Sequence, residues 1–152
     1  MSSTNAADPA PEFVDTNVFV YSYDQSAGRK RELALRLLDR LWLARTGCLS
    51  LQILQEFYVS ATGRLSPALT PSEAASEISA LAQWRLHEPV RSDLLSAIDL
   101  HQRLRVSFWD AMVLQSALRM GCQTLWTEDL SHGQSYAGVT VKNPFVSIAT
   151  RR

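Results

Sequence analysis

The feature that most constrains the fold is an alternation between short apolar runs and longer amphipathic segments. The first run, Phe13-Val14, stops at Asp15 and turns into a short helix, and segment 29–47 then carries leucines at helical spacing. Further helices are expected over residues 51–62, 70–84, 92–104 and 107–121, and further strands over 48–50, 122–127 and 138–145. This order predicts an α/β domain with a mainly parallel central sheet flanked by helices.

Local signals place several helix ends. Thr70 precedes Pro71 and Glu73 in the pattern of a capping box, which starts a helix. Gly47 and Gly121 stand where two other helices are expected to end. Ser50 is a further expected helix cap, for the segment that begins at residue 51.

Length and composition fit one globular domain. The chain has 152 residues, of which 46% are hydrophobic and 20% are charged, so it can bury a core of ordinary size. We assign residues 12–147 to the domain, residues 1–11 to a mobile N-terminal tail and residues 148–152 to a C-terminal tail. The formal net charge is +0, so any contact with nucleic acid would come from a local patch.

Several observations predict a cytoplasmic protein. The N-terminal residues lack the basic and apolar regions of a secretory signal. The sequence also contains no run of about 18 apolar residues, which a membrane-spanning helix would need. Cys48 and Cys122 have no neighbouring His or Cys, so we interpret them as reduced, buried thiols.

Four acidic side chains stand where the predicted elements meet. Asp15 and Asp129 follow strands, Asp110 opens a helix, and Glu56 lies on a helix that follows a strand. Taken singly, each has an ordinary explanation in a turn, a helix cap or a solvated helix edge. Together they can meet at the carboxyl edge of a parallel sheet, where ligands bind.

Such a cluster of carboxylates predicts a bound cation. Carboxylates in one cleft raise one another's pKa, and a divalent ion relieves their repulsion. Oxygen ligands without Cys or His favour Mg²⁺ or Mn²⁺. An ion of this kind keeps several waters and binds phosphate oxygens, which indicates phosphoester chemistry.

Four segments in order resemble a known family: "FVDTNVFVY", "LSLQILQEFYV", "VSFWDAMVLQSAL" and "LWTEDLSHGQ". Their order and spacing resemble a PIN-domain ribonuclease, in particular the VapC-type toxin of bacterial toxin–antitoxin pairs. The resemblance extends from about residue 13 to about residue 145. It implies a single PIN-like domain and a metal-dependent endoribonuclease that hydrolyses RNA phosphodiester bonds.

The resemblance also assigns four acidic and two supporting residues by position: Asp15, Glu56, Asp110, Asp129, Asn17 and Thr127. The acids would bind one or two Mg²⁺ or Mn²⁺ ions, with Asp129 assisting or orienting water. Glu128 adjoins Asp129, and either could face the metal, although the Thr-x-Asp register favours Asp129. The implied partners are substrate RNA, a cognate antitoxin protein and a second copy of the chain in a homodimer.

Other features have simpler interpretations. The basic cluster Arg29-Lys30-Arg31 could contact phosphate, but it fits a set of solvated helix charges better. The four tryptophans, Trp109 among them, are interpreted mainly as core or interface residues.

Two other functions stay open. The stretch "DTNVF" also resembles the nucleophile motif of haloacid-dehalogenase-like phosphatases, although Asn17 replaces their second acid. A PIN-fold module that binds RNA or protein without cutting it is the other alternative. Turnover of a small phosphomonoester would favour the phosphatase, and Mg²⁺-dependent RNA loss would exclude the inert module.

Overall fold

The computed structural model describes residues 9–146, which hold a six-stranded sheet in the order β3-β2-β1-β4-β6-β5. The strands are β1 (Glu12–Val14), β2 (Gly47–Ser50), β3 (Arg85–His87), β4 (Thr124–Trp126), β5 (Ser135–Tyr136) and β6 (Val139–Lys142). The helices are α1 (Thr16–Tyr23), α2 (Arg29–Ala44), α3 (Leu51–Gly63), α4 (Pro71–Leu81), α5 (Arg91–Leu104) and α6 (Phe108–Arg119). Among the described strands, β5 is antiparallel to β6 and the other pairs are parallel. The predicted α/β class is confirmed.

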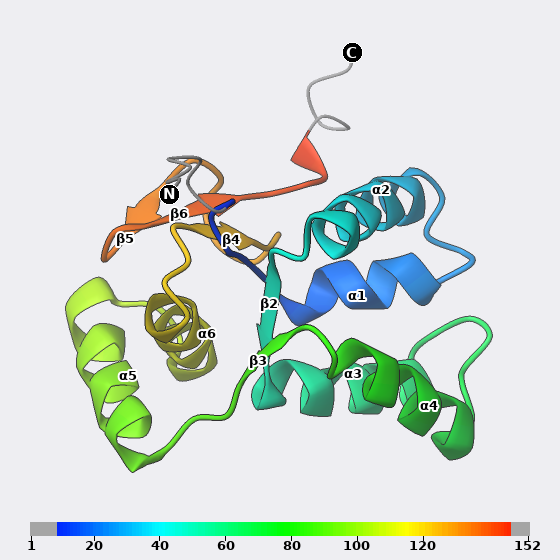
Figure 1. The fold of residues 1–152 in the computed structure, drawn as a ribbon, viewed down its shortest axis with the longest axis horizontal. Coiled ribbons are helices and arrows are strands. Elements are labelled where there is room, and N and C mark those ends of the chain that lie inside the picture. Colours follow the sequence, from blue (N-terminus) through cyan, green and yellow to red (C-terminus); the bar gives the residue numbers. More distant parts are fainter. Residues whose placement is uncertain (1–8, 147–152) are drawn as a thin grey trace, which may run out of the picture.

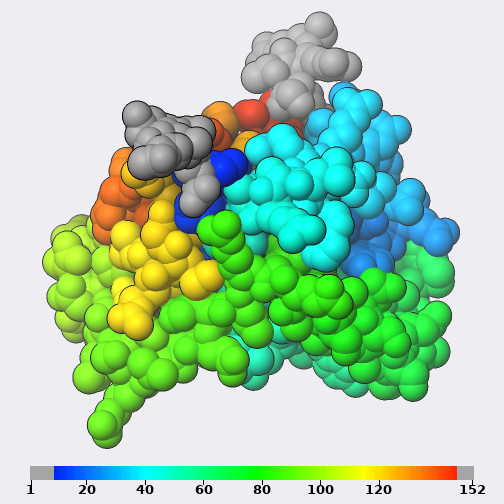
Figure 2. All heavy atoms as spheres, viewed as in Figure 1, coloured from blue at the N-terminus to red at the C-terminus, as the bar shows by residue number. Residues whose placement is uncertain are grey.

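The helices lie on the two sides of the sheet. Helices α5 and α6 pack against each other on one side, and α1 to α4 gather on the other (Figure 1). The segment from α4 through β3 to α5, green in Figure 2, crosses the face shown there. Phe13, Val14, Leu49 and Leu125 on the central strands are fully buried between these layers. The short central strands are therefore held by packing on both faces.

Several element boundaries differ from the prediction. Helix α2 ends at Ala44, and Arg45 caps it in the left-handed conformation. Gly47 begins β2 instead, where the Trp84 ring packs so closely that a Cβ atom would collide with it. Helix α4 ends at Leu81, before the predicted residue 84. Strands β3 and β5 are missing from the prediction, because such short strands carry little hydrophobic pattern.

Other expectations about the chain can be compared with the structure. Cys48 and Cys122 are both buried and unbridged, as predicted. Within residues 9–146, none of the helices combines the length and apolar character that a membrane crossing needs. The predicted tails at 1–11 and 148–152 lie mostly outside the described residues.

A buried polar cluster ties β3 to α5 and α6. The Asp93 carboxylate lies 3.3 Å from His87 Nε2 and accepts a hydrogen bond from Gln115 Nε2 at 3.1 Å. His87 Nδ1 and Ser116 Oγ are 2.8 Å apart. Because α6 carries Asp110 in its first turn, this cluster anchors the helix that bears a predicted site residue.

We expect Asp93→Ala to lower the free energy of unfolding by about 3–5 kcal/mol, because it leaves buried partners without their acceptor. Chemical denaturation measures this loss. The control is Asp99→Ala on the same helix, whose side chain is 62% exposed and pairs with Arg103. That change should stay within about 0.5 kcal/mol. Equally small losses for both variants would contradict the anchoring role.

Candidate active site

The site lies where β1 and β4 end side by side. Val14 pairs with Trp126 across these parallel strands, so Asp15 and Thr127 follow at the same edge of the sheet. The Asp15 amide donates to the Trp126 carbonyl at 2.9 Å, and the Thr127 hydroxyl donates to Asp15 Oδ2 at 2.7 Å. Strand β1 lies between β2 and β4, so the strand order reverses here. Ligands of such sheets bind at this kind of switch point.

Asp15 is both a helix cap and a buried carboxylate. Its Oδ1 accepts a hydrogen bond from the Thr16 amide at 2.8 Å, which caps α1, so the turn function considered above is real. Burial is the main cause that raises the pKa of Asp15 to about 7. The charges of Asp129 and Glu56 act in the same direction, against the hydrogen bonds from Thr127 and Thr16. The folded protein therefore disfavours the ionised form of Asp15.

Glu56 reaches the site from α3. Thr16 Oγ1 donates to Glu56 Oε1 at 2.6 Å, and Gln52 Nε2 lies 3.4 Å from Glu56 Oε2. Glu56 is thus hydrogen-bonded and half-buried, not a solvated edge residue. Ser50 occupies the N-cap position of α3, but the predicted side-chain cap is wrong, since its hydroxyl makes no capping hydrogen bond. Strand β2 beside β1 is what delivers α3 to this edge.

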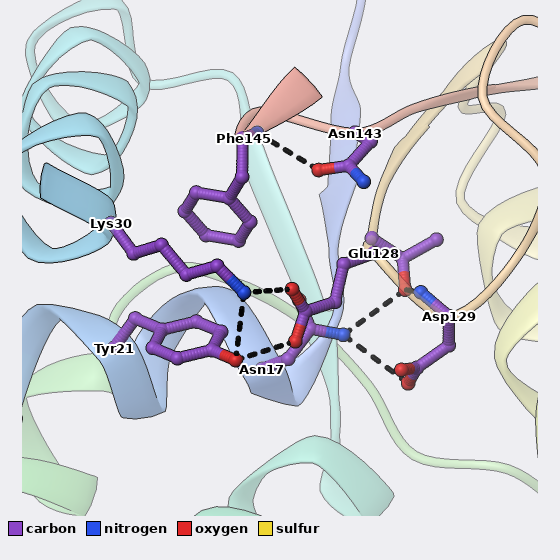
Figure 3. A network of polar contacts seen from close by, with 8 residues as sticks. Asn17, Tyr21, Lys30, Glu128, Asp129, Asn143 and Phe145 are labelled. Carbon is purple, nitrogen blue, oxygen red and sulfur yellow. Dashed lines mark hydrogen bonds and ion pairs between the residues drawn. The ribbon is translucent and has the colours of Figure 1, made fainter. Parts of the chain in front are cut away.

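Asn17 and Thr127 hold Asp129 on the other side. Asn17 Nδ2 donates to Thr127 Oγ1 at 3.1 Å and to Asp129 Oδ2 at 3.2 Å (Figure 3). Thr127 Oγ1 also accepts from the Asp129 amide at 3.0 Å. Burial raises the pKa of Asp129, and the charges of Asp110 and Glu128 add to this rise against the hydrogen bond from Asn17.

Glu128 has a different set of partners. Its Oε2 lies 2.9 Å from Lys30 Nζ, and its Oε1 accepts from the Tyr21 hydroxyl at 2.7 Å (Figure 3). The Lys30 ammonium also lies over the rings of Tyr21 and Phe145. Lys30 is therefore an exception to the interpretation of the basic cluster as mostly solvated helix charges. Glu128 is neutralised beside the site, whereas Asp129 faces the groove described below.

Asp110 lies in the first turn of α6, where the Ser107-x-x-Asp110 pattern places it. Its amide donates to Ser107 Oγ at 3.1 Å, so the Ser107 half of the predicted capping box is formed. Within residues 9–146, its carboxylate makes no hydrogen bond, and its charge raises the pKa of Asp129. Asp110 therefore acts on Asp129 through its charge, and its oxygens stay free of hydrogen bonds from the described residues.

The acids interact as like charges, but they do not form a complete metal-binding site. Within residues 9–146, no three His, Cys, Asp or Glu side chains stand close enough to hold a metal ion as they are. The donor set still fits a hard cation, because it offers carboxylate oxygens that repel one another. Asn17 Oδ1 is also buried without a hydrogen-bond donor in the described part of the chain. The residues that could hold such an ion are Asp15, Glu56, Asp110 and Asp129.

A groove of about 660 Å³ opens beside these acids. Its lining includes Thr16, Asn17, Glu56, Asp129 and Trp109. This volume lies within the usual range of ligand sites, about 300–1,000 Å³. The Trp109 side chain is 61% exposed, so it is not a core residue.

The comparison with family models decides the family. A model described as "PIN domain" matches residues 13–134, which is most of the chain. The chain belongs to the PIN domain family. This match spans β1 to α6 and the segment with Thr127 and Asp129, so it contains the whole candidate site of this PIN domain. No curated protein sequence matches the chain.

Several solved structures share the fold of this PIN domain. A chain of a toxin–antitoxin complex from Klebsiella pneumoniae is 19% identical with a TM-score of 0.64, covering 88% of this chain and 97% of that chain. A chain of DNA-bound VapBC from Salmonella typhimurium is 16% identical with a TM-score of 0.64, covering 90% and 99%. VapC20 from Mycobacterium tuberculosis, a sarcin–ricin loop cleaving toxin, is 20% identical with a TM-score of 0.58, covering 77% and 90%. At these identities the likeness shows the fold.

The sequence interpretation missed four side chains that organise the PIN-domain site: Thr16, Tyr21, Gln52 and Lys30. Thr16 sits in the quoted "DTN" stretch, but the pattern did not show that its hydroxyl crosses to α3. Lys30 and Tyr21 contact a loop about a hundred residues later in the chain. Gln52 joins α3 to the carbonyl of Trp109 at 3.4 Å. Each contact links distant segments, so no local signal identifies it.

We expect Asp15→Asn to stabilise the metal-free protein at high pH. Because folding raises the pKa of Asp15 from 3.8 to about 7, the wild type loses stability as pH rises through this interval, and the whole penalty is present above pH 7. Each pKa unit corresponds to about 1.4 kcal/mol, so the advantage of Asn should grow by more than about 1 kcal/mol between pH 5 and pH 8.

Denaturation in a chelator at both pH values measures this difference. The control is Asp39→Asn at an exposed position of α2, whose effect should be the same at both pH values. If the difference in unfolding free energy between Asp15→Asn and the wild type is the same at both pH values, folding does not raise the pKa of Asp15.

Proposed function

We propose that this PIN domain is a metal-dependent endoribonuclease that hydrolyses phosphodiester bonds in RNA. The observation that carries the proposal is the meeting of Asp15, Glu56 and Asp129 at one edge of the sheet, beside a groove of ligand size. Asp110 adds a fourth carboxylate with free oxygens. Hard oxygen donors gathered in this way favour a divalent ion that binds phosphate.

Each side chain has a proposed role. Asp15, Glu56 and Asp110 bind one or two Mg²⁺ or Mn²⁺ ions, and Asp129 assists or orients water. A bound ion of this kind lowers the pKa of a water and stabilises charge on the scissile phosphate. Asn17 and Thr127 support the acids, because Thr127 donates to Asp15 and Asn17 donates to Asp129.

We further propose that the chain is the toxin of a type II toxin–antitoxin pair. The partners would be a cognate antitoxin protein and a second copy of the chain, in the cytoplasm. Similar folds in a toxin–antitoxin complex and in DNA-bound VapBC support this proposal. Membership in the PIN domain family argues against the haloacid-dehalogenase-like phosphatase.

The first test is RNA cleavage by matched variants. Asp110→Asn should reduce the cleavage rate by about 100-fold or more, because it removes a charge that stabilises the ion. It should preserve the fold, since this carboxylate makes no hydrogen bond within residues 9–146. Asp15→Asn should behave alike while keeping the cap of α1. Exposed Asp39→Asn is the control and should cleave like the wild type.

Metal removal completes this test. A chelator should stop cleavage by the wild type, and added Mg²⁺ or Mn²⁺ should restore it. Undiminished cleavage by Asp110→Asn and Asp15→Asn would contradict the assignment. RNA that stays intact with either metal would instead support the inert RNA- or protein-binding module.

A second pair of variants separates the two adjacent acids. Asp129→Asn should slow cleavage at least about 10-fold more than Glu128→Gln, since losses of 10- to 100-fold are typical around metal sites. The Glu128 carboxylate forms an ion pair with Lys30, whereas Asp129 faces the groove. Single-turnover rates at saturating Mg²⁺ measure the difference. A larger loss for Glu128→Gln would move the assignment to Glu128.

A further inference from the structure

We infer that Trp109 is a stacking platform for an unpaired RNA base, and that Arg64 contacts a phosphate of the same strand. This inference rests on the proposed nuclease function and specifies a substrate subsite of that groove. Both residues line the groove that contains Glu56 and Asp129.

Trp109 is held firmly but left open. It precedes Asp110 in the first turn of α6, and its carbonyl accepts from Gln52 Nε2 at 3.4 Å. The Phe108 ring packs edge-on with ring centroids 4.9 Å apart. The indole nevertheless remains 61% exposed. Its backbone is therefore positioned while its aromatic surface stays free for a planar ligand, which would bury it favourably.

The surroundings of Trp109 match a nucleotide. Val59 on α3 is 65% exposed and lines the same groove, so the groove offers apolar contact as well as acids. A base is flat and apolar on its faces, so it fits an exposed indole with an apolar neighbour.

Arg64 supplies the charge that a strand needs. It caps the C-terminal end of α3, eight residues after Glu56, which corresponds to about 12 Å along the helix. It takes part in none of the ion pairs formed within residues 9–146. A strand that lies along α3 would therefore place one phosphate at the acids and another near this guanidinium.

These features select single-stranded RNA. Bases in a duplex are stacked on one another and offer no free face, whereas unpaired bases stack on aromatic side chains. Trp109 thus favours strands, loops or bulges whose bases are open.

The main test measures affinity for a fluorescein-labelled, twelve-nucleotide single-stranded RNA of mixed sequence. The full chain carries Asp15→Asn, so that the strand is bound in Mg²⁺ without being cut. Trp109→Ala and Trp109→Leu should each weaken binding by about 5- to 150-fold, and Trp109→Phe should restore most of the affinity. Trp42→Ala removes a tryptophan that is 51% exposed on α2, and it should bind normally. The same RNA in a duplex should show no dependence on Trp109.

Several results would overturn the subsite. Trp109→Ala is measured for affinity in the Asp15→Asn chain and for cleavage in a chain with Asp15 intact. If both values equal those of the proteins with Trp109, Trp109 does not bind substrate, and the nuclease proposal is unaffected. A change in particle mass by light scattering that accompanies the loss of affinity would assign Trp109 to an interface between copies. If the wild type fails to cut RNA with Mg²⁺ or Mn²⁺, the nuclease proposal fails, while the affinity series still decides the subsite.

Arg64 is tested by the salt dependence of the same binding reaction. Arg64→Ala should reduce the slope of log affinity against log salt by about 0.7, the value for one phosphate contact on a single strand. Arg103→Ala is the control, because Arg103 is exposed and paired with Asp99 on α5. Equal slopes for the wild type and Arg64→Ala would overturn the phosphate contact.

Discussion

The burial of the Asp15 carboxylate at the end of β1 is the interaction on which the rest of the site depends. Its two oxygens accept hydrogen bonds from the Thr16 amide and the Thr127 hydroxyl, so one side chain joins β1, α1 and the segment after β4. Hydroxyl and amide donors satisfy its oxygens without cancelling its charge. Thr16 extends this arrangement to Glu56. The fold thereby concentrates negative charge instead of neutralising it.

The two adjacent acids after β4, Glu128 and Asp129, differ in whether a cationic side chain neutralises them. Glu128 is neutralised by Lys30 and bound by Tyr21, whereas Asp129 receives only the neutral amide of Asn17 among the described side chains. A cationic side chain, Lys30, therefore pairs with Glu128 next to the site, whereas none of the described cationic side chains pairs with Asp129. Because none of the described Lys or Arg side chains pairs with Asp15 or Asp129, a divalent ion would stabilise their charge and could then bind a phosphate.

Much of the fold followed from local patterns, because strand–acid seams, caps and amphipathic spacing act over a few residues. The capping box at Thr70 and the helix that begins near Arg29 are examples. The end of α2 did not follow, because Gly47 is needed for close packing of Trp84 and not for a helix end. Position alone also predicted that acids meet at one edge of the sheet. The sequence could not show that Thr16 contacts Glu56 or that Lys30 pairs with Glu128.

By itself, the sequence determined the α/β order of elements and the placement of acids at strand ends and helix starts, since both depend on neighbouring residues. Only the tertiary structure decided which charges stay free. Whether Glu128 or Asp129 is neutralised depends on where α2 places Lys30, and whether Trp109 is buried depends on how α6 meets α3. Such choices are made by contacts between distant segments, whose energies have no counterpart in local sequence.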